Sequence, residues 1–143
     1  MADVHSKAVR SFNMSQIRSK DTKPEMIVRR FLHGKGFRFR LHDKRLPGKP
    51  DLVFKKHKAV IFINGCFWHG HAECKYYVIP KSNTEWWLNK IKGNIETDHK
   101  AIEKLKATGW LVITIWECEL KKDKLTNTLS TLPDRIKNEI RAL

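Results

Sequence analysis

Residues 59–74 constrain the fold more than any other segment of the chain. The segment begins with five apolar residues, 59–63, three of which are β-branched, and such a run is typical of a strand buried on both faces. Asn64 and Gly65 then predict a turn. Residues 66–74 add two cysteines, two histidines and two adjacent aromatic side chains, which is not the composition of a core. We therefore predict an α/β fold in which this strand end carries a metal site and a contact surface.

Cysteine and histidine side chains in and beyond this segment have the spacing of a zinc site. The candidate ligands are Cys66, His71, Cys74 and Cys118. Three thiolates and one imidazole suit tetrahedral zinc and leave no position for water, so the site would be structural. His69 is an equivalent competing ligand, and three free buried cysteines are the plain alternative. The odd cysteine count and the lack of an apolar secretory signal argue against disulfides and for a reducing cytoplasm.

A threonine followed three residues later by a glutamate, Thr22 and Glu25, predicts the start of a helix. In this capping box the hydroxyl and the carboxylate each satisfy a free backbone N–H. The helix should run to about residue 35, where glycines end it. Glu25 therefore has a structural explanation, which weakens a catalytic role inferred from its position alone.

Two short strands, residues 51–55 and 59–63, are separated by a tight connection and predict a hairpin that Asp51 opens. Metal-dependent nucleases use hairpins of this kind to hold a carboxylate beside the scissile phosphate. Upstream, residues 37–41 alternate apolar and basic side chains, which predicts a half-exposed strand. Residues 110–116 are a further apolar run and predict the last central strand.

A helical pattern runs from about residue 84 to about residue 108, and its apolar stripe includes one carboxylate. The stripe consists of Leu88, Ile91, Ile95, Asp98, Ile102 and Leu105. A buried carboxylate needs a partner. Asp98 therefore forms a salt bridge, or marks a local shift in which residues of the helix face the core. The functional alternative is that it holds a histidine in one tautomer, as the acid of a triad does. Residues 121–143 hold two weak helical patterns separated by Pro133, which we interpret as a closing helix.

The chain carries 29 Lys and Arg residues against 15 Asp and Glu residues, a formal net charge of +14. Residues 1–50 account for most of the excess, with 13 basic and 4 acidic side chains. We expect a polyanionic partner, because each phosphate that a protein neutralises releases counterions. Charge does not distinguish DNA from RNA or an anionic membrane surface. No apolar run approaches the roughly 20 residues of a membrane-spanning helix.

Four segments of the chain carry a family resemblance. They are Pro50 with Asp51, the run at residues 62–71, the run at residues 84–91, and Trp116 with Glu117 and Cys118. In this order, and over essentially the whole chain, they resemble the very short patch repair (Vsr) endonucleases. The resemblance implies one domain, residues 1–143, with a restriction-endonuclease-like fold. That fold is a mixed β-sheet flanked by helices, with a structural zinc.

The resemblance also implies a reaction. Vsr endonucleases nick one strand of double-stranded DNA on the 5′ side of the thymine in a T·G mismatch. Such mismatches arise when 5-methylcytosine deaminates within a methylase recognition sequence. We accordingly expect a monomer that works in a bacterial cytoplasm, at the nucleoid. Mismatch-repair proteins and a repair polymerase are its candidate partners.

The same resemblance assigns catalytic roles residue by residue. Asp51 and the main-chain carbonyl of Ile63 would hold Mg²⁺, and Glu25 would lie near the waters around it. His69 would be the general base that activates water, oriented by Asp98. The zinc ligands would be the three cysteines and the histidine that the spacing already suggests.

The DNA contacts that the resemblance implies are aromatic and apolar side chains. They are Phe67, Trp68 and Trp87, and, in an arm or short helix at residues 1–20, Met14 and Ile17. The aromatics would wedge into the base stack beside the mismatch, and the arm would enter the minor groove. Core packing is the plain alternative for the aromatics, and composition alone would allow Trp86 to take the role of Trp87.

One residue departs from the family pattern. Asn64 stands where some family members carry a histidine that supports the transition state or the leaving group. An asparagine can donate a hydrogen bond to a phosphate oxygen but cannot exchange a proton. Two other functions remain open: a zinc-stapled DNA-binding module without catalysis, and a nuclease of the same fold with another DNA substrate. A pure binding module has no reason to combine Asp51, His69 and Asp98.

Overall fold

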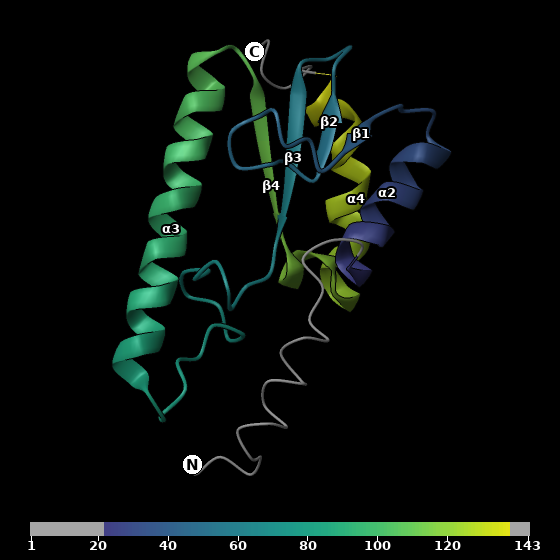
Figure 1. Cartoon of the computed structure of the whole chain (residues 1–143). Helices are drawn as coiled ribbons and strands as arrows, with labels where there is room; N and C mark the ends of the chain where they lie inside the picture. Colours follow the sequence, from purple (N-terminus) through teal and green to yellow (C-terminus); the bar gives the residue numbers. More distant parts are fainter. Residues whose placement is uncertain (1–21, 138–143) are drawn as a thin grey trace.

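The computed structural model describes residues 22–137 as a sheet with helices on both sides (Figure 1). The elements in chain order are α2 (Lys23–Gly34), β1 (Arg40–Leu41), β2 (Leu52–Phe54), β3 (Ala59–Asn64), α3 (Thr84–Ala107), β4 (Leu111–Trp116), the 3₁₀ helix η1 (Glu117–Leu120) and α4 (Lys122–Ile136). The arm expected at residues 1–20, with Met14 and Ile17, lies outside the described residues.

The four strands lie in the order β1-β2-β3-β4. β1 pairs with β2 and β2 with β3 in antiparallel fashion, which confirms the hairpin that Asp51 opens. β3 and β4 run parallel, and β4 lies at the edge of the described sheet, so the prediction of a central strand at residues 110–116 is wrong. Parallel neighbours need a long crossover connection, and α3 supplies it. The mixed sheet flanked by helices that the family resemblance implies is confirmed.

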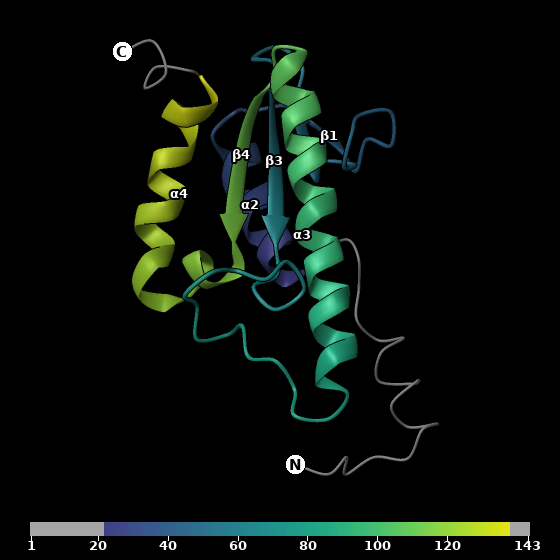
Figure 2. The same cartoon turned by 90° about the vertical axis from the view of Figure 1, so that its left-hand side faces the viewer.

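Helices cover both faces of the sheet (Figure 2). On one face, α2 and α4 pack against strand residues such as Ile61. On the other face, Leu105 of α3 packs against Val60. Successive residues of a strand point to opposite faces, so a strand covered on both sides must be apolar throughout. This double burial explains the unbroken apolar run at residues 59–63.

α2 begins where the capping motif predicts. The hydroxyl of Thr22 accepts a hydrogen bond from the backbone N–H of Glu25 at 3.4 Å. Val28 and Leu32, one turn apart on the helix, are fully buried in the core on that face of the sheet. The carboxylate of Glu25 does not turn back to close the capping box; it contacts side chains that are described with the site.

Two further local predictions are wrong. The strand expected at residues 37–41 is limited to Arg40–Leu41, because Phe37 turns inward and meets the Phe54 ring edge-on at 5.9 Å. Pro133 does not divide the C-terminal segment, since α4 continues through it. A proline inside a helix costs about 3 kcal/mol, and the complete burial of Leu132 and Ile136 on either side offsets that cost.

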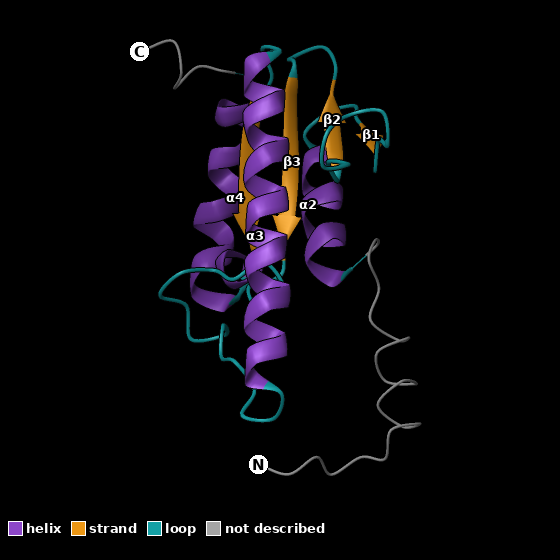
Figure 3. Cartoon of the chain, turned by 60° about the vertical axis from the view of Figure 1, so that its left-hand side comes forward, coloured by secondary structure: helices purple, strands orange, loops and turns teal. Residues whose placement is uncertain are grey.

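α3 follows its predicted stripe only in part. Ile91 and Leu105 are buried, but Leu88 and Ile95 are exposed, and Ala101 is buried instead. The N-terminal half of α3 extends past the ends of the strands, and of the described segments only the preceding loop lies beside it (Figures 1 and 3). Neither α3 nor any other helix in the described part of the chain is long and apolar enough to cross a lipid bilayer.

Candidate active site and zinc centre

The paired ends of β3 and β4 bring distant cysteines together. Asn64 and Trp116 are the last residues of these strands and are partners across the parallel ladder. Cys66 and Cys118 each lie two residues further on, and the backbone N–H of Cys118 donates a hydrogen bond to Cys66 Sγ at 3.4 Å. The register of the two strands therefore places Cys118 against the loop that follows β3.

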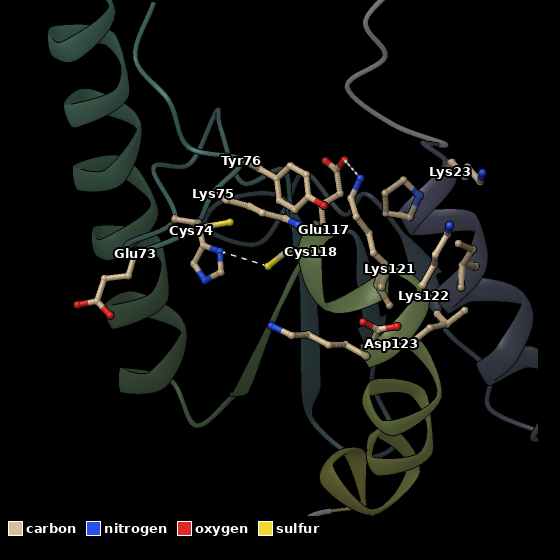
Figure 4. Close-up of a pocket in the computed structure, with 16 residues that line it drawn as sticks. Lys23, Glu73, Cys74, Lys75, Tyr76, Glu117, Cys118, Lys121, Lys122 and Asp123 are labelled. Atoms are coloured by element: carbon tan, nitrogen blue, oxygen red, sulfur yellow. Dashed lines mark hydrogen bonds and ion pairs between the residues drawn. The ribbon is translucent and has the colours of Figure 1, made fainter.

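Four side chains each place one ligand atom within 4.8 Å of the others. They are Cys66, His71, Cys74 and Cys118. Cys118 Sγ lies 3.5 Å from His71 Nδ1 (Figure 4), and the His71 ring stacks on Trp116 with 4.1 Å between centroids. Burial raises the pKa of the Cys66 thiol to about 12 and raises that of Cys118, and a neighbouring cation would favour the thiolate form that burial disfavours. Three thiolates and an imidazole suit a structural zinc.

The two histidines that compete in sequence have different partners. His71 faces the thiols, whereas His69 Nδ1 lies 2.6 Å from Asp98 Oδ2 on α3. Asp98 is the carboxylate in the predicted apolar stripe, and its partner is thus a histidine rather than a lysine or arginine. About a third of each side chain is exposed, so water can reach the pair.

A glycine lets the loop after β3 dock on α3. Gly70 has a φ of +59°, and a Cβ there would lie 2.6 Å from Ile95 Cδ1 and 2.8 Å from Ile91 Cγ2 of α3, so a larger residue would strain the backbone and displace these side chains. On the same helix, Asn94 donates a hydrogen bond to the carbonyl oxygen of Trp68 at 2.9 Å. Asn94 and Asp98 are one turn apart and share a face. The docking that fixes the loop therefore also brings His69 to Asp98.

Asp51 is held at the same end of the sheet. Its backbone N–H donates to the Ile61 carbonyl at 3.0 Å, and its carboxylate accepts from the backbone N–H of Ile63 at 2.7 Å. The N–H and C=O of one strand residue point the same way, so the Ile63 carbonyl faces the side of Asp51. Burial raises the pKa of Asp51 to about 6, and the Glu25 carboxylate adds to the rise, although the Ile63 hydrogen bond and His69 oppose it.

Glu25 and Asp51 lie together with His42, a residue that the sequence analysis missed. Ligand atoms of the three side chains lie within 4.8 Å of one another. Two desolvated carboxylates this close repel each other unless a cation lies between them. Their oxygens and the Ile63 carbonyl are hard donors of the kind that Mg²⁺ takes. The sequence offered one indication of a role for His42, namely a histidine directly after the strand predicted at residues 37–41.

Phe67, Trp68 and Trp87 form one aromatic cluster. The ring centroids lie 5.3 Å apart for Phe67 with Trp68 and for Phe67 with Trp87, and 5.6 Å apart for Trp68 with Trp87. All three side chains are half-buried, whereas Trp86 is 58% exposed and meets Trp87 edge-on. Trp87 therefore belongs to the cluster, and Trp86 lies at its outer side.

The structure brings the predicted catalytic residues of the described chain to one end of the sheet. They are Glu25, Asp51, Ile63, Asn64, His69 and Asp98. His69 is close enough to Asp51 to act on its pKa, and Asn64 is a buried residue directly after Ile63. Strand ends, one helix start and one helix face thus supply side chains to a common site.

A pocket of about 1080 Å³ lies between the start of α2, the loop before α3 and the start of α4, and the candidate zinc ligands His71, Cys74 and Cys118 form part of its wall (Figure 4). Its lysines are Lys23, Lys75, Lys121, Lys122 and Lys124, against three carboxylates. Lys121 Nζ lies 3.8 Å from a Glu117 oxygen and 4.6 Å from the centre of the Tyr76 ring. None of the predicted catalytic residues lines the pocket. Its surplus of lysines suits a polyanion.

Comparisons with known proteins give matches over nearly the whole chain. Residues 2–75 match the family model described as "DNA mismatch endonuclease Vsr". The chain is 49% identical over 141 residues to the type II nicking enzyme V.NmeAIP of Neisseria meningitidis, covering 98% of this chain and 100% of that protein. It is 46% identical over 132 residues to the DNA mismatch endonuclease Vsr of Escherichia coli, covering 92% and 84%. It is 44% identical over 138 residues to the type II nicking enzyme V.XorIIP of Xanthomonas oryzae, covering 96% of each.

Proposed function

Because the chain belongs to the Vsr family of DNA mismatch endonucleases and is a DNA nicking endonuclease, we propose that it cuts duplex DNA on the 5′ side of the thymine in a T·G mismatch. The cut would start very short patch repair of deaminated 5-methylcytosine. The observation that carries the catalytic part of this proposal is the 2.6 Å contact of His69 with Asp98, close to Asp51. A module that only binds DNA has no use for this arrangement.

His69 is the general base in this proposal. Asp98 engages Nδ1, so Nε2 is the ring nitrogen left to accept a proton from water. The carboxylate orients the ring and stabilises the imidazolium that forms. As the proton leaves, the water oxygen bonds to phosphorus and one ester P–O bond of the backbone breaks. Asn64, which cannot exchange a proton, donates a hydrogen bond to a phosphate oxygen.

Asp51 and the Ile63 carbonyl are the proposed ligands of Mg²⁺, with Glu25 close by. When bound, Mg²⁺ would act as a Lewis acid toward the phosphate oxygens, on which negative charge develops. The hydrogen bond from the Ile63 N–H fixes one carboxylate oxygen of Asp51. The second oxygen, 4.0 Å from His42 Nε2, is the one turned toward Glu25 and His42.

The aromatic cluster is the proposed wedge. Phe67 and Trp68 lie between zinc ligand Cys66 and the base His69 in sequence, so the zinc loop holds wedge and base on one scaffold. Stacking a base on an aromatic side chain contributes about 1–3 kcal/mol. That is comparable to the cost of unstacking a step already weakened by a mismatch. A T·G site would then admit the wedge more readily than a matched site.

The expected partner is thus double-stranded DNA, and the bacterial nucleoid is the proposed place of action. The positive charge of the chain and the lysines around the pocket support binding to the phosphate backbone. We propose that the protein acts as a monomer and that mismatch-repair proteins and a repair polymerase act after it.

The direct test is a pair of duplexes that differ only in one T·G or T·A pair, incubated with zinc-loaded protein and Mg²⁺. We expect a nick in the thymine strand of the mismatched duplex only. Equal cutting of both duplexes would favour a nuclease with another DNA substrate. Two of the relatives are named type II nicking enzymes, which is consistent with that alternative. Binding without cutting, across several flanking sequences, would favour a non-catalytic module.

The adjacent tryptophans Trp86 and Trp87 offer a matched test of the wedge. We expect Trp87→Ala to weaken binding to the T·G duplex by about 5- to 150-fold, the range that follows from losing one aromatic stack. Trp86→Ala should have a smaller effect, because Trp86 lies outside the contacts with Phe67 and Trp68. Titration of each variant with labelled duplex measures this. Equal losses in both variants, or none in Trp87→Ala, would contradict the assignment.

A further inference from the structure

His42 stands where a ligand of the catalytic cation would stand. Its Nε2 lies 2.9 and 3.0 Å from the two carboxylate oxygens of Glu25 and 4.0 Å from Asp51 Oδ1. The three side chains come from α2, from the turn after β1 and from the residue before β2. Only 14% of the His42 side chain and 2% of the Glu25 side chain are exposed, so the imidazole is committed to this cluster.

The distances match those between donors around one ion. For bonds of about 2.1 Å in octahedral geometry, neighbouring donors lie about 3.0 Å apart and opposite donors about 4.2 Å apart. Nε2 and the Glu25 oxygens have the first spacing, and Nε2 and Asp51 Oδ1 are close to the second. A single cation can therefore contact all three side chains with little rearrangement.

A purely structural role explains the position of His42 less well. Glu25 already has a cationic partner, since Arg29 Nη1 lies 3.2 Å from its Oε2. His42 is also held in the left-handed region, with a φ of +46°, a conformation that costs free energy in a non-glycine residue. The backbone N–H of His42 donates to the carbonyl oxygen of Asp51 at 3.0 Å, and this bond ties the strained residue to the ligand-bearing one.

We propose that His42 Nε2 is a direct ligand of the catalytic cation, together with Asp51 and Glu25, and that the resulting nitrogen–oxygen donor set favours Mn²⁺ over Mg²⁺. This proposal rests on the proposed function, because it concerns the cation of the same site. Imidazole is a softer donor than carboxylate or carbonyl, and it binds first-row transition ions better than it binds Mg²⁺. An all-oxygen site, as the sequence analysis assigned it, would not carry this preference.

Spin-echo spectroscopy of bound Mn²⁺ tests the proposal without any turnover. Zinc-loaded protein with one equivalent of Mn²⁺ should show modulation from a directly bound imidazole ¹⁴N, which changes when histidine is labelled with ¹⁵N. His42→Gln keeps a donor for the Glu25 hydrogen bond but removes the nitrogen ligand. We expect it to lose the modulation and to weaken Mn²⁺ binding by about tenfold or more, with a smaller loss for Mg²⁺.

His33→Gln, an exposed histidine on α2, and His69→Gln are the spectroscopic controls, and both should keep the modulation. Wild-type protein that binds Mn²⁺ without a coupled imidazole nitrogen, or that does not bind Mn²⁺ at all, would overturn the proposal. So would modulation that survives in His42→Gln, or equal losses of Mn²⁺ and Mg²⁺ affinity. The T·G nicking assay in Mg²⁺ is independent of these readouts, so failure of the ligand assignment and failure of the proposed function are distinguishable.

Discussion

Replacing Asp51 by asparagine is expected to reduce nicking of a T·G duplex by about a thousandfold or more while leaving DNA binding close to that of the wild type. The size follows from losing the anionic ligand of a Lewis acid that contributes several kcal/mol to the barrier. Asparagine keeps an oxygen that can accept from the Ile63 N–H, so the local backbone should hold. Binding should persist because phosphates are attracted by basic groups, and the substitution removes a negative charge.

Stability gives an internal control for this variant. Asp51 has a pKa of about 6 in the folded chain against 3.8 as the ordinary value. As pH rises, the unfolded chain therefore loses this proton first, and the folded state is progressively destabilised between about pH 4 and pH 6. Without added Mg²⁺ and with zinc still bound, Asp51→Asn should be more stable than wild type at pH 7, by up to about 3 kcal/mol. Denaturant unfolding at pH 4 and pH 7 measures the change.

Two results would contradict the role of Asp51. If nicking and mismatch binding fall together, and the unfolding midpoint falls with them, then Asp51 supports the fold rather than the reaction. If nicking survives, the cation is held elsewhere in the site. The Asp51→Ala variant serves as a harsher comparison, because it also removes the acceptor for the Ile63 N–H and should lose stability that the asparagine keeps.

The sequence predicted those features that depend on local patterns or rare residue types. The run at residues 59–63 is apolar throughout because both faces of β3 are covered, and a half-exposed strand would instead alternate apolar and polar side chains. The start of α2 is set by a hydrogen bond between Thr22 and Glu25, which are only three residues apart in the sequence. Cysteines are scarce in this chain, so their placement after turns and strands was informative before the register of β3 and β4 was known.

Features set by tertiary geometry were not predictable in the same way. His42 reaches Glu25 because a left-handed backbone turns it there, and no residue pattern predicts that turn. Leu88 and Ile95 are exposed because α3 extends past the sheet. The spacing of apolar residues predicts which face of a helix is apolar, but not how much of that face the sheet covers. Pro133 remains within α4 because its neighbours are buried. The free energy of that burial outweighs the low helix propensity of proline.

Removing zinc is expected to abolish nicking and to disorder the loop at residues 65–80 while the central core persists. Zinc binding contributes about 10 kcal/mol or more in small zinc peptides, and here the proposed ligands would join that loop to Cys118 in η1, two residues after the end of β4. The hydrophobic clusters on the two faces of the sheet include no residue of the loop at residues 65–80, so they should remain packed without zinc. Purified protein should contain one zinc per chain by elemental analysis. Chelation should change tryptophan fluorescence, because Trp68 and Trp87 lose their fixed contact.

The neighbouring histidines separate the two roles of this loop. His71→Ala should lose stoichiometric zinc, loop order and nicking together, because His71 is the imidazole in the thiol cluster. His69→Ala should keep its zinc and its unfolding midpoint but lose nicking, because its partner is Asp98. A third variant, His99→Ala at an exposed position on α3, should change neither zinc content nor nicking. Zinc lost from His69→Ala and retained in His71→Ala would reverse the assignment. If the protein contains no zinc and chelators leave it unchanged, the zinc assignment is wrong. The rigidity of the loop that carries the wedge and the base would then need another cause.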